Sequence, residues 1–355
     1  MHLPEIFNLK NDTDKQKFKQ IALNPAITVF DEIDRQLLDL MLCRHPALSS
    51  EQVQAQGLVE EFLQQNAQTN EEYGNWVYYP WKKLVVHVLP EREFVEVRTN
   101  RNKYKITPEE QEKLGQKVVG IAGLSVGRTI ATTMALERVA GEIRLADFDE
   151  IELSNLNRIK APLTEIGLNK AIATAREIAE IDPYIKVVCY KNGLSEENMN
   201  SFFTSERKMD LFIEECDDIK IKVVARLKCK ELQIPVIMET NDNCIIDIER
   251  FDLEPERPIF HGKLSEEDIE LCKVAKTLQQ KMVILTKIID PTTISDGLKR
   301  SLPEIGKSIR SWPQVASDVI SGGGILVQLS TRILIGKDTK SGSFISESSV
   351  LSQLC

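Results

Sequence analysis

The stretch KVVGIAGLSVGR, Lys117 to Arg128, decides the fold, because a short apolar run ends in a glycine-rich turn and leads into a helical pattern. Four further apolar runs follow it, with helical or polar segments between them: EIRLADFD (142–149), IKVVCYK (185–191), LFIEE (211–215) and IPVIMET (234–240). Short apolar strands that alternate with helices are typical of a parallel sheet covered on both faces. The sequence therefore predicts an α/β protein with a doubly wound, mostly parallel sheet of the Rossmann type.

The glycine-rich turn, Gly123–Gly127, lies where the first predicted strand meets the first predicted helix. In an open α/β sheet a nucleotide phosphate binds here, because the free N–H groups and the dipole of the helix favour anions. Asp147 ends the second predicted strand, where an acidic residue holds a ribose hydroxyl in nucleotide-binding folds. Together these features predict a nucleotide site. The alternative is that the glycines only let the helix pack closely on the strand.

The same turn also has the G-x-S-x-G pattern of the nucleophile elbow in α/β-hydrolases. Ser125 would then be the nucleophile, and it would need a later acid and a later histidine. His261 is the only histidine downstream of the turn. A hydrolase leaves Asp147 without a purpose, so this is the weaker alternative, and His261 is expected to be structural.

The pattern along the chain predicts three parts. Residues 1–105 form an N-terminal extension that is mainly helical, as in the amphipathic stretch Val29–Leu42, with a short strand region at its end. Residues 106–335 hold the α/β pattern and end in a late helix with three consecutive glycines (322–324). Residues 336–355 are polar and are expected to form a disordered tail.

The composition excludes several classes of protein. The 355 residues have a net charge of −9, which argues against a nucleic-acid partner, since that affinity comes from Lys and Arg. We expect no membrane segment, because no apolar run approaches the roughly 20 residues that span a bilayer, and the start does not read as a secretory signal. Seven scattered cysteines without C-x-x-C spacing indicate neither a zinc ribbon nor a disulfide framework. A cytoplasmic location is the simplest expectation.

Motifs beyond the turn narrow the interpretation. They are Asp147-Phe-Asp149 after the second strand, SNLNR at 154–158, Lys170 in GLNKA and Asp217 in EECDD. In their order and spacing they resemble the ThiF/MoeB superfamily of adenylating enzymes, which includes the ubiquitin-activating enzymes. The resemblance runs from about residue 100 to residue 251. It is greatest to a bacterial subgroup with a long N-terminal extension, in which a nitroreductase-like domain often follows.

The resemblance implies an ATP-dependent adenylyltransferase, which joins a carboxylate to the α-phosphate of ATP and releases pyrophosphate. The carboxylate is expected to be the C-terminus of a small protein or peptide. ATP and Mg²⁺ are the implied cofactors, because charge that builds on the phosphates must be met by cations. The residues implied to bind the nucleotide are Gly123, Ser125, Gly127, Asp147, Asp149 and Asn155.

The resemblance also implies separate roles for individual side chains. Asp147 would hold the ribose, Arg158 and Lys170 would bind the phosphates, and Asp217 would carry Mg²⁺. The family acts as a homodimer in which one subunit lends an arginine to the site of the other. Arg101, in the sequence R-T-N-R before the first strand, stands at the corresponding position.

The sequence departs from the family pattern at several points. Ser125 and Arg128 replace glycines of the turn G-x-G-G-x-G, and Arg128 either adds bulk at the helix start or adds a phosphate contact. The zinc-binding cysteine pairs of many bacterial members are absent, and Cys244 is the nearest candidate for a thioester cysteine, although a free cysteine is usually inert packing. Glu239 stands at the mouth of the sheet, where it either recognises an amine of the substrate or has a structural role.

Two other functions stay open. One is an NAD-dependent oxidoreductase that uses the same turn, although a dinucleotide site has no need of Arg158, Lys170 and Asp217 together. The other is a non-catalytic relative that binds a nucleotide and acts as a scaffold, which the altered glycines and the absence of a clear thioester cysteine favour.

Overall fold

The computed structural model describes residues 3–66, 69–275, 277–289 and 292–345. The chain forms two compact units. The first extends to Gln111 and also includes Ala179–Tyr184, and the second comprises Glu112–Ile178 and the chain from Ile185 onward. The expected boundary at residue 105 and the observed one at Gln111 therefore differ by part of one short helix, α6 (Pro108–Leu114).

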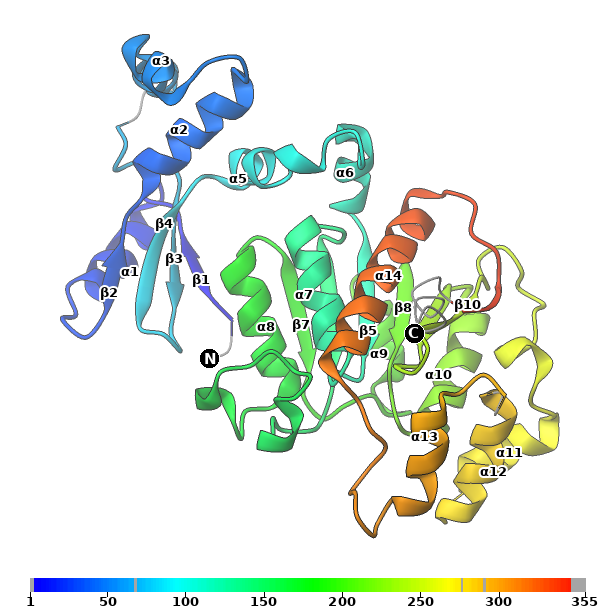
Figure 1. Cartoon of the computed structure of the whole chain (residues 1–355). Coiled ribbons are helices and arrows are strands. Elements are labelled where there is room, and N and C mark those ends of the chain that lie inside the picture. Colours follow the sequence, from blue (N-terminus) through cyan, green and yellow to red (C-terminus); the bar gives the residue numbers. More distant parts are fainter. Residues whose placement is uncertain (1–2, 67–68, 276, 290–291, 346–355) are drawn as a thin grey trace. The chain divides into compact units, whose positions relative to one another are not determined.

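A seven-stranded sheet forms the centre of the second unit, in the order β11-β10-β9-β8-β5-β6-β7 (Figure 1). Strands β5 to β9 run parallel, and β10 and β11 add an antiparallel edge. This confirms the predicted doubly wound, mostly parallel sheet. The strands are β5 (Val118–Ala122), β6 (Glu142–Ala146), β7 (Lys186–Tyr190), β8 (Leu211–Glu214), β9 (Val236–Glu239), β10 (Ile245–Glu249) and β11 (Gly342–Ile345).

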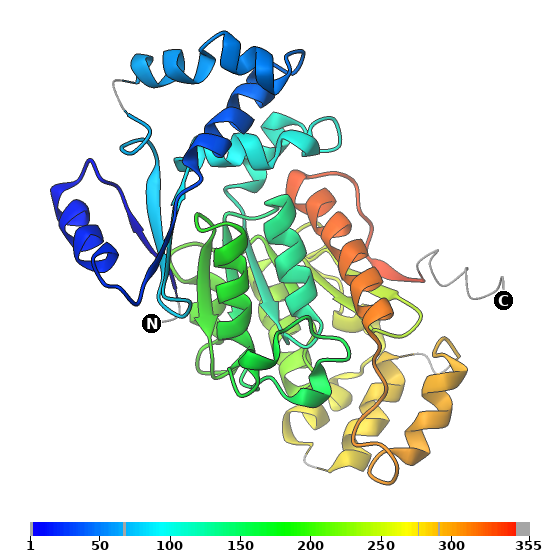
Figure 2. The ribbon, with the colours of Figure 1, turned by 60° about the vertical axis from the view of Figure 1, so that its left-hand side comes forward.

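Helices cover both faces of this sheet, with α7, α8 and α14 on one face and α10 on the other (Figure 2). This follows from the alternating pattern, because each parallel crossover returns the chain over one face. Strands β5, β8 and β9 are apolar almost throughout, as expected of strands buried on both sides. The helices are α7 (Gly127–Glu137), α8 (Lys170–Ile181), α9 (Met199–Thr204), α10 (Ile219–Leu232), α11 (Glu266–Val274), α12 (Leu278–Ile288), α13 (Asp296–Ser301) and α14 (Ala316–Ile335).

The late helix α14 is unbroken at its three glycines and contacts α7 and β9. Among the described residues, it is the one helix whose length and hydropathy would allow it to cross a membrane, a possibility that the sequence patterns did not predict. Half of its most apolar window is buried within the protein, as is normal for a core helix.

The first unit contains a four-stranded sheet in the order β1-β3-β4-β2. The expectation of helix through the first 70 residues is wrong at β1 and β2, and Val29 and Phe30 belong to a strand rather than to the predicted helix. The elements of this unit before α6 include helices as well as the four strands. They are β1 (Glu5–Phe7), α1 (Asp12–Ala22), β2 (Thr28–Phe30), α2 (Ile33–Arg44), α3 (Ser50–Ala55), α4 (Leu58–Gln65), β3 (Asn75–Tyr79), β4 (Leu84–Val88) and α5 (Glu91–Arg98).

The expected disordered tail is partly ordered. Gly342–Ile345 forms β11, which pairs antiparallel with β10 in the register Ile245 to Ile345. The prediction for residues 346–355 lies outside the described residues.

A buried network of charges joins β8, α10 and β10. Arg226 of α10 forms ion pairs with Glu214 and with Glu249, at 2.7 Å for Glu249, and all three side chains are fully buried. The Lys222 ammonium lies 3.0 Å from both oxygens of Glu214. Burial alone would raise the pKa of Glu214, but Lys222 and Arg226 hold it below its ordinary value. Each buried charge is therefore compensated by an opposite one.

We expect Arg226→Met to destabilise the protein by about 3–5 kcal/mol, because it removes the cation that pairs with the buried Glu249 and leaves Glu214 with Lys222 alone. Lys228→Met is the matched control on the same helix, since Lys228 pairs with Glu231 at the surface and should cost less than about 1 kcal/mol. Urea unfolding followed by circular dichroism measures both. Equal effects of the two variants would contradict the assignment of Arg226 as the centre of the network.

Candidate functional site

The candidate site lies at the carboxyl ends of β5, β6 and β8. β5 is the strand from which the chain continues first to one side of the sheet, through β6, and later to the other, through β8. Ligands of open α/β sheets bind in the crevice at such a switch point. The loops after these strands carry Gly123–Gly127, Asp147 and Asp217, so the fold brings these predicted residues to one edge of the sheet.

The glycine-rich turn depends on Gly123. Its φ angle is +88°, and a Cβ atom would lie 2.2 Å from the carbonyl oxygen of Glu215. Only glycine therefore allows the loops after β5 and β8 to approach so closely. Gly127 begins α7, and its N–H donates to the carbonyl of Gly123, which closes the turn onto the helix.

Asp147 ties this turn to the end of β6. One carboxylate oxygen accepts the Leu124 N–H at 2.6 Å, and the other accepts the Asp149 N–H at 2.8 Å. Burial raises the pKa of Asp147, although these hydrogen bonds and Lys170 oppose the shift. An ionised carboxylate has about four acceptor positions, so two are left to accept ribose hydroxyls.

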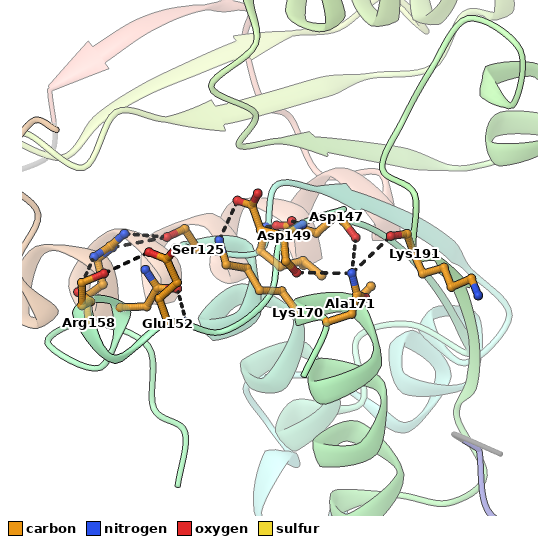
Figure 3. Close-up of polar contacts among 12 residues, drawn as sticks. Ser125, Asp147, Asp149, Glu152, Arg158, Lys170, Ala171 and Lys191 are labelled. Atoms are coloured by element: carbon orange, nitrogen blue, oxygen red, sulfur yellow. Dashed lines mark hydrogen bonds and ion pairs between the residues drawn. The ribbon is translucent and has the colours of Figure 1, made fainter. Parts of the chain in front are cut away.

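Lys170 and Asp149 form an ion pair at the start of α8 (Figure 3). The ammonium of Lys170 lies 2.8 Å from the Asp149 carboxylate, and the backbone N–H of Lys170 donates to the Asp149 carbonyl at 2.8 Å. The lysine side chain is buried, whereas half of the aspartate side chain is exposed. A cation is thus held in a fixed place beside Asp147, where a phosphate can reach it.

Asn169 is a structural residue of the site that the sequence analysis missed. Its amide nitrogen donates to the carbonyls of Asp147, Asp149 and Lys191, at 3.0 to 3.2 Å. Its oxygen accepts the N–H of Ala171, the typical contact of a helix N-cap. The signal for this role was available, because an asparagine directly before a helical pattern is a preferred cap.

Arg158 reaches the glycine-rich turn from the SNLNR loop. Its guanidinium donates to the Ser125 hydroxyl at 3.0 and 3.3 Å (Figure 3). Burial lowers the pKa of Arg158, and the nearby negative charge of Asp217 opposes this. Asn155 is buried, and its side-chain oxygen accepts the Glu152 N–H at 3.0 Å. It therefore shapes the loop that carries Arg158.

Arg128 has no phosphate-binding role in this arrangement. Its guanidinium is buried and forms ion pairs with Glu165 at 3.0 Å and with Glu177 at 2.8 Å. The sequence analysis left open a phosphate contact, and the two ion pairs disfavour it, because they hold the guanidinium away from solvent. Because these contacts hold the Arg128 side chain against Glu165 and Glu177, it does not add bulk at the start of α7.

A pocket of about 180 Å³ adjoins this edge of the sheet. It begins at Ser125 and Asp217 and continues past the end of β9. Asp217 is open to solvent within this hollow, but the surrounding protein atoms raise the pKa of its carboxyl group. The pocket is lined by Ser125, Val126, Glu215, Cys216, Asp217, Lys222, Met238, Glu239, Thr240, Asn241, Asp242, Leu285, Thr286, Ile288, Ile289, Ile294, Leu298, Leu302, Trp312, Pro313 and Gln314.

Two glutamates meet in the wall of this pocket. The Glu215 carboxylate accepts the backbone N–H of Glu239 at 3.0 Å, and the Glu239 carboxylate accepts the N–H of Asn241 at 2.8 Å. Glu239 is only 3% exposed, and its second oxygen has no partner among the described residues. Burial raises the pKa of Glu239 to about 8, with help from Asp318 and Asp242.

The alternatives based on a nucleophile fit this geometry poorly. Ser125 is hydrogen-bonded to Arg158, whereas His261 pairs with Asp247 of β10 at 2.9 Å, so no serine–histidine pair is formed. Cys244 is buried immediately before β10. Burial also raises the pKa of the Cys216 thiol well above its ordinary value, which disfavours a thiolate there.

Arg101 belongs to a different unit of the chain from the other predicted site residues. It is exposed on a 3₁₀ turn, Asn100–Asn102, that belongs to the first unit, whereas the other predicted site residues all belong to the second. Among the described residues, no group of three or more His, Cys, Asp or Glu side chains is arranged to hold a metal ion. Asp217 is therefore a single carboxylate open to the pocket.

The family of the chain follows from comparison with known proteins. The model of the ThiF family matches residues 98–344. The match extends over both the candidate site at the sheet edge and the pocket, and the chain belongs to the ThiF family. This confirms the resemblance drawn from the motifs.

Individual relatives are similar over different lengths. The uncharacterized protein MT1398 of Mycobacterium tuberculosis (strain CDC 1551 / Oshkosh) is 43% identical over 273 residues, 77% of this chain and 38% of that protein. The chain thus spans less than half the length of that relative. The tRNA threonylcarbamoyladenosine dehydratase of Bacillus subtilis is 25% identical over 65% of this chain and 93% of its own. The solved structure of TcdA (CsdL) shares the fold, with a TM-score of 0.50 and 16% identity over 67% of this chain and 94% of that one.

The unpaired carboxyl group of Glu239 predicts a pH-dependent stability. Its pKa rises from an ordinary value of 4.5 to about 8 in the folded protein. Between these two pH values the carboxyl group is protonated in the folded state and ionised in the unfolded state. The stability of the wild type should therefore fall relative to Glu239→Gln as the pH rises from about 5 to 8, by up to about 1.4 kcal/mol per pH unit. Urea unfolding at several pH values measures this difference. Glu267→Gln, at an exposed position of α11, is the control and should show no such trend.

Proposed function

We propose that the chain is an ATP-dependent adenylyltransferase that activates a carboxylate as an acyl-adenylate and releases pyrophosphate. The observation that supports this most directly is the continuity of the site. Ser125 and Asp217 belong both to the nucleotide-binding edge and to the lining of the pocket, so a carboxylate in the pocket would lie beside the phosphates of a bound nucleotide. Membership of the ThiF family supports the same reaction class.

Each charged group at the edge has a role in this proposal. Asp147 accepts the ribose hydroxyls with the acceptor positions that Leu124 and Asp149 leave open. Lys170, buried and fixed against Asp149, and Arg158, fixed against Ser125, bind the phosphates and stabilise the charge that builds on them. These cations are already positioned, so little reorganisation is needed when the negative charge develops.

Asp217 is the residue that would hold Mg²⁺. Magnesium is commonly bound in such sites by one or two carboxylates together with the substrate phosphates and water. A single carboxylate that is open to the pocket and lacks a hydrogen-bonding partner among the described residues fits this requirement. When bound, Mg²⁺ would neutralise charge on the phosphates and on the leaving pyrophosphate.

The size of the pocket suggests what kind of carboxylate enters. A volume of about 180 Å³ accepts a group of amino-acid size but no folded domain. A small molecule or the terminal residue of a chain can enter, and the C-terminus of a small protein or peptide is the substrate we propose. The Bacillus subtilis relative is named for an enzyme of a modified tRNA nucleoside, but the net charge of −9 on this chain favours a partner other than nucleic acid.

The two competing functions are less well supported. An NAD-dependent oxidoreductase would leave Asp217 and the pair of phosphate-binding cations without a purpose. A scaffold that only binds nucleotide was favoured by the bulk of Arg128 at the start of α7, but that side chain is withdrawn into ion pairs with Glu165 and Glu177. The six cysteines of the described residues form no disulfide, which supports a reducing compartment such as the cytoplasm.

Replacement of Asp217 tests the proposed reaction. Asp217→Asn should reduce ATP–pyrophosphate exchange by about 100-fold or more, because it removes the carboxylate that would hold Mg²⁺. The fold should be intact, because Asp217 takes no part in the buried network of Glu214. Exchange is measured in the presence of mixed peptides as carboxylate donors.

The control for this experiment is Glu256→Gln, which removes an exposed carboxylate of the same unit. It should leave exchange unchanged. Exchange at the wild-type rate in Asp217→Asn would contradict the role of Asp217. No exchange by the wild type, together with tight ATP binding, would favour the scaffold.

We further propose that the protein works as a homodimer in which Arg101 completes the site of the partner subunit. In a dimer with twofold symmetry, each site then combines Asp217 of one chain with Arg101 of the other. Arg101→Ala and Asp217→Ala should each be inactive alone. When the two variants are co-expressed with different tags, mixed dimers contain one intact site.

The mixed preparation should regain about a quarter of wild-type exchange, since half of the dimers are mixed and each has one working site. Purification through both tags in sequence checks that mixed dimers form. Mixed dimers without activity would show that Arg101 does not act across subunits, and a purely monomeric protein would exclude the proposal altogether.

A further inference from the structure

The pocket wall has more acidic than basic side chains. Among the described residues, its lining contains four acidic side chains, Glu215, Asp217, Glu239 and Asp242, and one basic side chain, Lys222. Lys222 is already committed to both oxygens of Glu214 at 3.0 Å. A substrate whose only charge was its carboxylate would therefore meet several carboxyl groups beyond the phosphates, and among the described lining residues no uncommitted basic side chain.

These acids are not equivalent in their contacts. Asp242 accepts the N–H and the hydroxyl of Ser295 at 2.7 and 2.6 Å, which fixes the start of α13. Glu215 accepts the Glu239 N–H and holds the end of β9. The second oxygen of Glu239, by contrast, is buried and has no partner among the described residues, although burial without a hydrogen bond is costly.

The neighbouring helix α14 leaves room for this carboxyl group. A Cβ atom on Gly322 would lie 2.5 Å from the carboxyl carbon of Glu239. Any other residue at position 322 would therefore displace the glutamate. Gly322 therefore leaves the space in which the Glu239 carboxyl group lies at the pocket wall. As a glycine, it has no side chain that could donate a hydrogen bond to the unpaired oxygen of Glu239.

Apolar side chains form much of the remaining wall. They come from α12, α13 and the segment before α14, and the set includes Leu285, Ile288, Ile289, Leu298 and Trp312. An occupant that fits both surfaces is partly hydrocarbon and bears a hydrogen-bond donor for Glu239. The excess of acids selects a charged donor over a neutral one.

We propose that the carboxylate substrate also carries an ammonium group, and that Glu239 binds this group while the apolar wall packs against the carbon chain between the two ends. This inference rests on the proposed function for the position of the carboxylate, beside Ser125 and Asp217. The raised pKa of Glu239 is a supporting sign, because a bound cation would favour the ionised form and return the pKa toward its ordinary range.

The binding test uses three probes of similar length: 6-aminohexanoate, its N-acetyl derivative and hexanoate. Isothermal titration of the full chain should show that 6-aminohexanoate binds about tenfold or more tightly than the other two. In Glu239→Gln this preference should disappear, because the amide cannot pair with a cation. The affinity for hexanoate should not fall.

Two controls separate charge recognition from structural damage. Glu267→Gln, at an exposed position of α11, should keep the preference of the wild type. Thermal unfolding at pH 7 checks that Glu239→Gln is folded. Gly322→Ala, which crowds Glu239, should also weaken binding of 6-aminohexanoate. Equal affinity of the wild type for all three probes, or no binding of any probe, would overturn the inference.

The ammonium group has two sources that share this chemistry. Norleucine carries it on the α-carbon, as a free amino acid does, whereas Nα-acetyl-lysine carries it at the end of a side chain, as the last residue of a peptide would. The preferred compound identifies the source, and rejection of both in favour of hexanoate would contradict the proposal.

A separate measurement, ATP–pyrophosphate exchange, tests the proposed adenylation. Binding of 6-aminohexanoate through Glu239 without exchange from any acid would contradict adenylation and leave the charge preference in place. Exchange that hexanoate supports as well as 6-aminohexanoate does would keep adenylation and overturn the role of Glu239.

Discussion

The buried ion pairs of Glu214 are the constraint on which the second unit depends. Charges removed from water are tolerated only when they are paired and hydrogen-bonded, so Arg226 must lie between Glu214 and Glu249. This requirement fixes the end of β8 against α10 and β10. The loop that carries Glu215 and Asp217 starts at this point, so its position is set by residues that have no proposed contact with a ligand.

The sequence was sufficient to predict the five parallel strands of the second unit, but neither its antiparallel edge of β10 and β11 nor the sheet of the first unit. The strands of the larger sheet are continuously apolar and alternate with helices, and both signals are local. In the first unit, Glu5–Phe7 and Thr28–Phe30 are three-residue strands whose pairing with Asn75–Tyr79 and Leu84–Val88 is set by contacts far along the chain. Three residues are too few to show a period of two, so nothing in the local pattern marks them.

In the candidate site, too, some features could be predicted from the sequence and others could not. Motif spacing identified Asp147 and Lys170, because their roles are tied to the ends of strands and the start of a helix. The ion pairs of Arg128 could not be predicted, because Glu165 and Glu177 lie far from it in the sequence and approach it only in the folded chain. The unpaired oxygen of Glu239 could not be predicted either. No sequence pattern indicates that a buried carboxyl group has no hydrogen-bonding partner.

The pairing of β11 with β10 has a consequence for solubility. An edge strand presents a row of open N–H and C=O groups to any other chain in solution. Ile245–Glu249 is fully buried and strongly apolar apart from its acids, and Gly342–Ile345 covers its outer side. A truncated version of the protein that ends at Gly336 would expose the apolar edge of β10 and favour self-association through that edge. Every residue of the proposed nucleotide site would still be present.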